Sequence, residues 1–278
     1  MQAALPVSQQ QSMLSHLRWI VSDSLVVAKR HLSHLKTTPD KLVGMMIQPL
    51  VFVVLFGYVF GSAISVPGIN YREFLIPGVF AMTMAGTLVS AATGTAEDKS
   101  KGIINRLRTM PIGRSVALLG STVANLAEAC LNMVILVICG LAVGWRIHTD
   151  PLHVAAGIGL LLCLQFAMNW LGTFIGLLVS SAESADTVAM TIFLPISFLS
   201  NTFVPTDGMP AWLRIAAEWS PVSATVAACR ELFGNTGTAP ALDSWPMQHP
   251  IVATLGWCVV ILAVFMPLCI RRFRTMSE

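Results

Sequence analysis

The stretch Val154–Ser180, VAAGIGLLLCLQFAMNWLGTFIGLLVS, contains no charged residue. A helix rises 1.5 Å per residue, so this stretch is long enough to cross the ~30 Å hydrocarbon core of a bilayer. Its apolar residues do not alternate with polar ones, as they would in the strands of a transmembrane barrel. The stretch therefore predicts a membrane-spanning helix.

Five further stretches of comparable length have the same composition. The chain is 55% hydrophobic and 11% charged, with a mean hydropathy of +0.71, whereas roughly a quarter of the residues in soluble domains are charged. We therefore predict an all-α membrane protein in which residues 42–270 form a domain of six transmembrane helices. The expected spans are Leu42–Ala63, Phe74–Ala96, Val116–Trp145, Val154–Ser180, Thr187–Val204 and Ile251–Ile270.

Lys and Arg are distributed unequally between the two sides of these spans. Thirteen of the 17 lie before the first span, after the second or after the sixth, and the other four lie on the opposite side. Because cytoplasmic segments are enriched in Lys and Arg, we expect residues 1–41 and the tail 271–278 to lie on the cytoplasmic side of the cell membrane. The formal net charge of +3 is small, which argues against nucleic acid as a partner.

Two basic segments on the cytoplasmic side also carry apolar residues at helical spacing. Within residues 14–35 the apolar positions recur every three or four residues, which predicts an amphipathic elbow helix lying in the membrane plane, with simple anchoring as the favoured role. In Glu97–Arg114, EDKSKGIINRLRTMPIGR, an apolar ridge lies among basic residues and ends at Pro111. This second helix, about residues 99–111, either rests on lipid headgroups or docks a soluble partner.

The outer segment between the fifth and sixth spans contains two apolar stretches too short to cross, separated at Ser220-Pro221. Together they predict short re-entrant helices in the outer leaflet, at about residues 207–233. Trp212, Trp219 and Trp245 suit the membrane interface.

Polar side chains within the spans are costly, so each needs a reason. Interhelical hydrogen bonding is the favoured interpretation. The alternatives are that these residues line a substrate path, or that Glu128, the one charged residue in the spans, carries a proton. The residues are Asn125, Glu128 and Asn132 in the third span and Gln165 and Asn169 in the fourth. The pairs Gly57/Gly61, Gly140/Gly144 and Gly172/Gly176 have the small-residue spacing of close helix contacts.

No sequence pattern typical of catalysis is present. We find no G-x-x-x-x-G-K-[ST] phosphate loop, no H-E-x-x-H, no G-x-S-x-G and no C-x-x-C, and the six cysteines are scattered. We therefore expect a protein that is not itself an enzyme and binds neither a metal nor a cofactor.

Two motifs in sequence order resemble a known family. The first comprises Gly102-Ile103-Ile104 and Pro111-Ile112-x-Arg114 on the cytoplasmic side. The second follows the fifth span and comprises Pro195, Ser200, Phe203, Pro205, Met209-Pro210, Trp212, Pro221 and Arg230. With the six spans, they make the chain resemble the type-2 permease subunits of ABC exporters, and the daunorubicin-resistance group in particular. One departure is that Ser100-Lys101, rather than an acidic residue, precede Gly102.

The resemblance implies a transport path driven by separate ATP-binding subunits, which would hold the ATP and Mg²⁺. It also implies pairing with a second permease copy or a paralogue, and export of an amphipathic drug, lipid or related compound. The segment that would couple the path to the ATP-binding subunits comprises Gly102, Ile103, Ile104, Arg106, Leu107, Arg108, Met110, Pro111 and Arg114. Two alternatives remain open on the sequence, a proton-coupled secondary transporter that uses Glu128 and a structural membrane subunit that transports nothing.

The unequal charge distribution makes a direct prediction about topology. In a cysteine-free background, single cysteines at Ser100 and Ser277 should react with a membrane-impermeant maleimide only from the cytoplasmic side, and one at Thr238 only from outside. Labelling of position 100 in intact cells would overturn the predicted orientation.

Overall fold

The computed structural model describes residues 47, 49–61, 64, 66–102, 114–237 and 244–275. The amphipathic helix expected within residues 14–35 and residues 103–111 of the second basic helix lie outside this part of the chain. The described residues form helices and one isolated bridge between Val66 and Ile69, with no β-strand among them. The all-α prediction is confirmed for the part of the chain that the structure describes.

The helices follow one another along the chain with short connections. A helical segment that includes Pro49–Val59 precedes them and ends as a π-helix, η1. The elements are η1 (Leu55–Phe60), α3 (Tyr71–Ala85), α4 (Thr87–Ser100), α6 (Arg114–Val143), α7 (Pro151–Leu178), α8 (Ala182–Phe198), η2 (Thr206–Gly208), α9 (Ala211–Glu218), α10 (Pro221–Phe233), α11 (Trp245–Gln248) and α12 (Pro250–Thr275).

Three helical stretches within the described residues are long and apolar enough to cross a membrane. They are Tyr71–Ser100, which joins α3 and α4 at Gly86, then Pro151–Leu178 and Pro250–Arg272. Pro49–Val59 and Glu128–Val143 are shorter apolar helices. The expected second, fourth and sixth spans therefore have counterparts of full length, whereas the complete six-span topology stays a prediction.

The helix in the region of the expected fifth span begins and ends earlier than Thr187–Val204. Helix α8 starts at Ala182, because the Ser181 side chain accepts a hydrogen bond from the Ser184 backbone N–H and caps the first turn. It ends at Phe198, three residues after Pro195, and the polar residues Ser200–Thr202 that follow are buried in turns.

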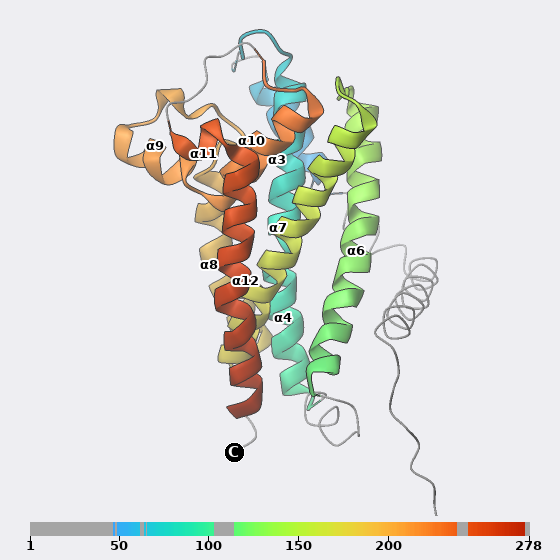
Figure 1. Ribbon diagram of the computed structural model, residues 1–278, viewed down its shortest axis with the longest axis vertical. Helices are drawn as coiled ribbons and strands as arrows, with labels where there is room; N and C mark the ends of the chain where they lie inside the picture. Colours follow the sequence, from blue (N-terminus) through green and yellow to red (C-terminus); the bar gives the residue numbers. More distant parts are fainter. Residues whose placement is uncertain are drawn as a thin grey trace, which may run out of the picture.

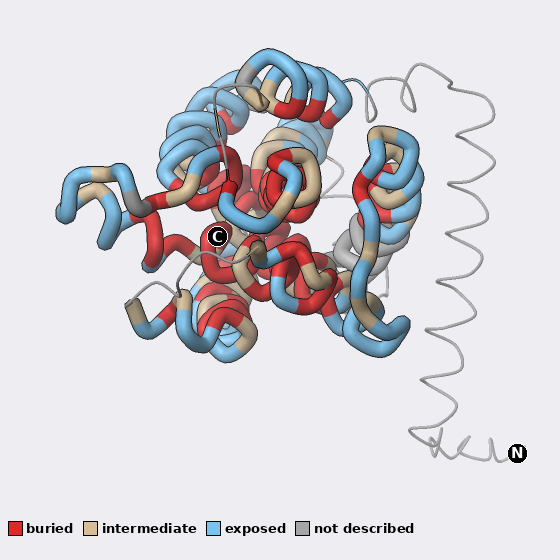
Figure 2. The backbone as a smooth tube through the Cα atoms, turned by 90° about the horizontal axis from the view of Figure 1, so that it is seen from above, coloured by how far each residue is buried: buried red, intermediate tan, exposed pale blue. Residues whose placement is uncertain are grey.

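The two ends of the bundle carry different structures (Figure 1). The short helices α9, α10 and α11 gather at one end, and the C-terminal end of α12 lies at the other, together with the end of α4 and the start of α6. The two basic segments, near residue 100 and after residue 270, thus lie at the same end, as the charge distribution predicts. Viewed along the bundle, the buried residues lie where the helices face one another (Figure 2).

Helices α4 and α7 make the most extensive contact among the described helices. A Cβ atom added at Gly172 would lie 2.2 Å from the Leu88 carbonyl oxygen, and one at Gly176 would lie 2.4 Å from that of Ala92. Only glycine lets the two backbones approach this closely. The small-residue pair predicted at Gly172 and Gly176 is therefore confirmed as a close helix contact.

At the opposite end, a buried arginine joins three segments of the chain. Arg230 of α10 donates from Nε to the Phe74 carbonyl of α3 at 2.9 Å, and from Nη2 to the carbonyls of Asn201 at 2.9 Å and Thr202 at 3.2 Å. Its guanidinium carbon lies 3.4 Å from the centre of the Phe74 ring. Burial lowers the pKa of Arg230 to about 9, so the side chain stays charged at neutral pH.

These contacts explain several residues of the second motif. Phe203 stacks on Phe56, with ring centres 4.1 Å apart, and its carbonyl accepts a hydrogen bond from the Tyr71 hydroxyl at 2.7 Å. Pro210 precedes the first residue of α9, and Pro221 is the first residue of α10, where a missing N–H costs nothing. The motif thus builds the cap at this end of the bundle.

The close packing of α4 on α7 leads to a stability prediction. Gly172→Ala should lower the stability of the purified protein by about 1–3 kcal/mol, because the new methyl group meets a backbone oxygen that cannot move freely. Unfolding in mixed micelles with increasing denaturing detergent would measure the change. Gly159→Ala is the matched control on the same helix, since a Cβ at Gly159 meets nothing within 4 Å. Equal losses in the two variants would contradict the packing argument.

Candidate functional site

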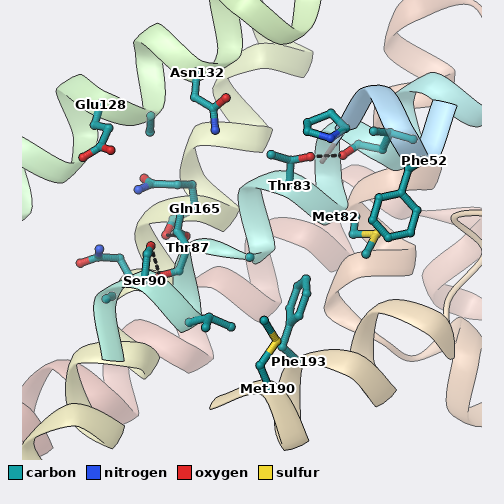
Figure 3. Close-up of a pocket in the computed structure, with 17 residues that line it drawn as sticks. Phe52, Met82, Thr83, Thr87, Ser90, Glu128, Asn132, Gln165, Met190 and Phe193 are labelled. Carbon is teal, nitrogen blue, oxygen red and sulfur yellow. Dashed lines mark hydrogen bonds between the residues drawn. The ribbon is translucent and has the colours of Figure 1, made fainter. Parts of the chain in front are cut away.

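A pocket of about 600 Å³ lies among the helices (Figure 3). Its walls come from α3, α4, α6, α7 and α8, and from Pro49 and Phe52 of the first described helix. This volume falls within the usual range for sites that hold drug-sized molecules.

The pocket lies at half depth along the long helices. Gly86, one of its lining residues, lies midway along the stretch Tyr71–Ser100. Glu128 and Gln165, also in the wall, lie near the middle of α6 and α7. Roughly 14 residues of helix separate each of them from either end, which corresponds to ~21 Å. A solute in this pocket would therefore be far from both ends of the bundle.

Three hydroxyl groups on one side of the pocket come from α3 and α4. Thr83 donates to the Val79 carbonyl at 2.8 Å, Thr87 to the Met84 carbonyl at 2.7 Å, and Ser90 to the Thr87 carbonyl at 3.1 Å. Each hydroxyl thus donates a hydrogen bond to a carbonyl of its own helix, which allows these residues to lie in an apolar environment. Each oxygen keeps lone pairs free for another partner.

The facing wall contains four of the five polar residues that the sequence singled out. Glu128 and Asn132 project from α6, and Gln165 and Asn169 lie on α7. Gln165 and Asn169 are buried, at 1% and 4% exposure. Asn132 Oδ1 and Gln165 Oε1 are buried without a hydrogen-bond partner. The fifth residue, Asn125, belongs to the backbone of α6, but its side chain lies outside the description.

The structure thus places these polar residues around one space rather than in direct contact. Among the described residues, no hydrogen bond joins any of the four to another. The Thr87 hydroxyl lies 3.4 Å from the Gln165 backbone carbonyl oxygen, which it reaches from α4. Hydrogen bonding among these four side chains is therefore not observed in the described part of the chain, and the lining of a substrate path stays a prediction.

The rest of the lining is apolar and includes residues that sequence reasoning missed. Phe52, Met82, Met190 and Phe193 lie together at one side of the pocket (Figure 3). Thr83 and Thr87 were also missed, although their spacing of four places them on one face of the second span. That spacing is the signal that could have identified this wall. The sequence offered no comparable signal for Met190 and Phe193 of α8, because an apolar residue that lines a pocket cannot be told from one that faces lipid.

The end of α4 connects the pocket wall to the segment that the resemblance assigns to coupling. Lys99 Nζ donates to the carbonyls of Leu177 at 3.2 Å and Val179 at 2.9 Å, at the C-terminal end of α7, where unpaired carbonyls favour a cation. Gly102 has a left-handed φ of +66° and ends the helix, as glycine commonly does. The structure thus places Gly102, whereas residues 103–113 lie outside the description.

The groups around the pocket are suited to binding a solute. Within the described residues, no group of three or more His, Cys, Asp or Glu side chains is placed to hold a metal ion. Glu128 is the one carboxyl group among the described lining residues, no histidine lies beside it, and the hydroxyls of Thr83, Thr87 and Ser90 donate to backbone carbonyls. Reversible binding by hydrogen bonds and apolar contact is the chemistry that this arrangement supports.

Comparison with known proteins identifies relatives that match most of the chain. The family model for the ABC-2 type transporter matches residues 24–233. The daunorubicin resistance ABC transporter permease protein DrrB1 of Streptomyces coeruleorubidus is 28% identical over 254 residues, which cover 91% of this chain and 87% of the relative. The doxorubicin resistance ABC transporter permease protein DrrB of Mycobacterium tuberculosis is 22% identical over 232 residues, covering 81% and 80%.

The pocket predicts a pattern of chemical accessibility. In a variant without the six native cysteines, a cysteine at Asn132 should react with a small water-soluble thiol reagent about tenfold faster, or more, than one at Leu136, because only a solvated thiolate reacts. Leu136 is the matched control, one turn further along α6 and 2% exposed. Labelling rates in detergent would measure the difference, and equal rates would show that water does not reach the pocket.

Proposed function

The chain belongs to the ABC-2 type transporter family, and we propose that it forms the membrane path of an exporter driven by separate ATP-binding subunits. The permease names of its relatives support the role of a membrane subunit. The chain itself would not hydrolyse ATP. ATP and Mg²⁺ would be bound by the partner subunits, in keeping with the absence of a phosphate-loop motif from this sequence.

The observation that carries this proposal is the pocket at half depth, with polar groups from α4, α6 and α7 in its wall. Polar and ionisable side chains inside a membrane are rare, and they commonly mark a substrate path. The same pocket has an apolar side, so it suits an amphipathic substrate such as a drug or a lipid. Because the names of the relatives include daunorubicin and doxorubicin, drugs are the first substrate class to test.

Coupling would run through the cytoplasmic segment about 99–114 and the helix ends above it. The bonds from Lys99 to the Leu177 and Val179 carbonyls tie the end of α4 to the end of α7. Both helices carry pocket residues, so a force applied to this segment would reach two walls of the pocket. ATP-driven closure of the partner subunits would then favour one of two arrangements of the path. Coupling is the free energy that links ATP binding in those subunits to this change in the path.

The complete transporter would contain two permease chains, either identical or paralogous, with two ATP-binding subunits beneath them. It would lie in the cell membrane with both termini in the cytoplasm, as the distribution of Lys and Arg favours. Exposed apolar residues on α8 and α12, such as Leu194 and Val259, would contact lipid or the second permease chain.

The proposed docking role of the coupling helix, about residues 99–111, leads to a prediction about coupling. Burying a Leu side chain is worth roughly 1.5–3 kcal/mol, whereas an exposed ion pair contributes about 0–1 kcal/mol. Leu107→Asp should therefore strongly reduce co-purification of the ATP-binding subunits or substrate-stimulated ATP hydrolysis, while the permease still inserts into the membrane. Arg108→Ala should have a much smaller effect, and its size should depend on salt concentration.

The two variants also distinguish a docked helix from one that only rests on lipid headgroups. A lipid-resting helix predicts the reverse order, because loss of a basic residue weakens its attraction to anionic lipid. The measurement is ATP-dependent transport and ATP hydrolysis by the complex in proteoliposomes, with both variants side by side. Normal coupling in Leu107→Asp would overturn the assignment of residues 103–111 to coupling.

A further inference from the structure

Helices α7 and α12 make the second most extensive contact among the described helices. Both begin at the end of the bundle that carries α10 and α11 and run toward the other end (Figure 1). The rings of Phe174 and Phe265 lie with their centres 5.5 Å apart. The Cys269 thiol donates a hydrogen bond to the Trp170 carbonyl at 3.5 Å. These contacts fix which residues of the two helices are neighbours.

Within this interface, two cysteines that are far apart in the sequence meet. The side chains of Cys163 on α7 and Cys258 on α12 are hydrogen-bonded to each other. Both are free thiols, and Cys258 is 1% exposed whereas Cys163 is half-buried. The scattered positions of the six cysteines in the sequence do not indicate this pair, because it depends on how α7 and α12 pack.

The pair lies at the depth of the lipid acyl chains. Roughly eight residues of helix, or ~12 Å, separate Cys258 from the first residue of α12. The stretch Pro250–Arg272 is long and apolar enough to cross a membrane, and Val259, next to Cys258, is 64% exposed. The half-buried Cys163 thiol can therefore be reached by a small molecule dissolved among the acyl chains, whereas a charged reagent is excluded from this depth.

Two thiols in contact differ chemically from a single thiol. Oxidation of one cysteine gives a sulfenic acid, which condenses with a neighbouring thiol to form a disulfide. The sulfur atoms of a disulfide lie about 2 Å apart, so two sulfur atoms that are already hydrogen-bonded need only a small movement to form one. Cys269, whose thiol bonds a backbone carbonyl instead, offers a comparison on the same helix.

From these contacts we propose that Cys163 and Cys258 form a redox-active dithiol, which a lipid hydroperoxide oxidises to a disulfide that joins α7 to α12. The Cys163 sulfur takes the terminal oxygen of the hydroperoxide, whose O–O bond breaks to leave the lipid alcohol. The Cys258 sulfur then displaces the hydroxyl of the sulfenic acid, forms the S–S bond and releases water. In total the two thiols lose two electrons and two protons, and the hydroperoxide is reduced to an alcohol and water.

The test exposes the full-length permease to a lipid-soluble hydroperoxide. The reduced protein, in nanodiscs of a saturated lipid, is treated with cumene hydroperoxide, and free thiols are counted after denaturation with a maleimide that adds mass. Two of the six thiols should be lost, dithiothreitol should restore them, and the protein should remain a single chain on a non-reducing gel. Mass spectrometry after digestion without reduction should find Cys163 joined to Cys258, with Cys269 still a thiol.

A matched pair of variants assigns the reaction to these two residues. Cys258→Ala should abolish the reversible loss of two thiols, because no second thiol is left to displace the sulfenic hydroxyl. Cys269→Ala removes another buried cysteine of α12 and should leave the loss unchanged. The disulfide should also raise the concentration of denaturing detergent needed for unfolding, and this increase should be absent in Cys258→Ala.

The possible results separate this inference from the proposed exporter function. Retention of all six thiols, a loss that dithiothreitol does not reverse, or a disulfide between other cysteines would overturn it. These readings come from the unmodified protein, so they hold even if a variant fails to fold. None of them involves a transported solute or an ATP-binding subunit, so a failure of the inference and a failure of the proposed function are distinguishable.

Discussion

The close approach of α4 and α7 at Gly172 and Gly176 is the contact on which the rest of the described structure depends. In a bilayer the lipid tails are as apolar as the helix surfaces, so the hydrophobic effect gives helices little reason to associate. Close packing of one helix backbone on another must therefore supply part of the attraction between helices. A single methyl group at Gly172 would come within 2.2 Å of the Leu88 carbonyl oxygen, so the contact tolerates no larger side chain without a shift. It fixes which turns of the two helices are neighbours, and those turns carry Thr87 and Gln165 at the wall of the pocket.

The pocket exists because this tight contact is not repeated around the whole bundle. Within the described residues, helix α6 contacts α7 and α3 less extensively than α4 contacts α7, and Glu128 and Asn132 line the pocket. Hydroxyl groups are tolerated there because each donates a hydrogen bond to a carbonyl of its own helix. The amide oxygens of Asn132 and Gln165 differ from these hydroxyls, since both are buried without a hydrogen-bond partner.

The two ends of the bundle are stabilised by different contacts. At one end, Arg230 donates hydrogen bonds to the Phe74 carbonyl of α3 and to the carbonyls of Asn201 and Thr202, so these buried acceptors in the turns after α8 are paired. At the other end, Lys99 bonds the final carbonyls of α7. A buried arginine thus joins segments at one end of the bundle, and a lysine joins α4 to α7 at the other. The pocket lies between them, and two of the helices that line it, α4 and α7, are the ones that Lys99 joins.

The sequence by itself determined the helical membrane class, the approximate position of each long apolar segment and the end of the bundle at which the basic segments lie. Those features follow from composition and from the cost of unpaired backbone groups in lipid. It also marked Glu128, Asn132, Gln165 and Asn169 as costly, but it could not say that they face one another. Three glycine pairs had the same spacing. Only at Gly172 and Gly176 would both added Cβ atoms lie within 2.5 Å of the backbone of a neighbouring helix. Arg230, one of the four basic residues assigned to the outer side, is buried. The physical reason is that lipid-facing and core-facing residues of a membrane helix are both apolar. Periodicity therefore does not reveal which face turns inward, and only the packed tertiary structure decides it.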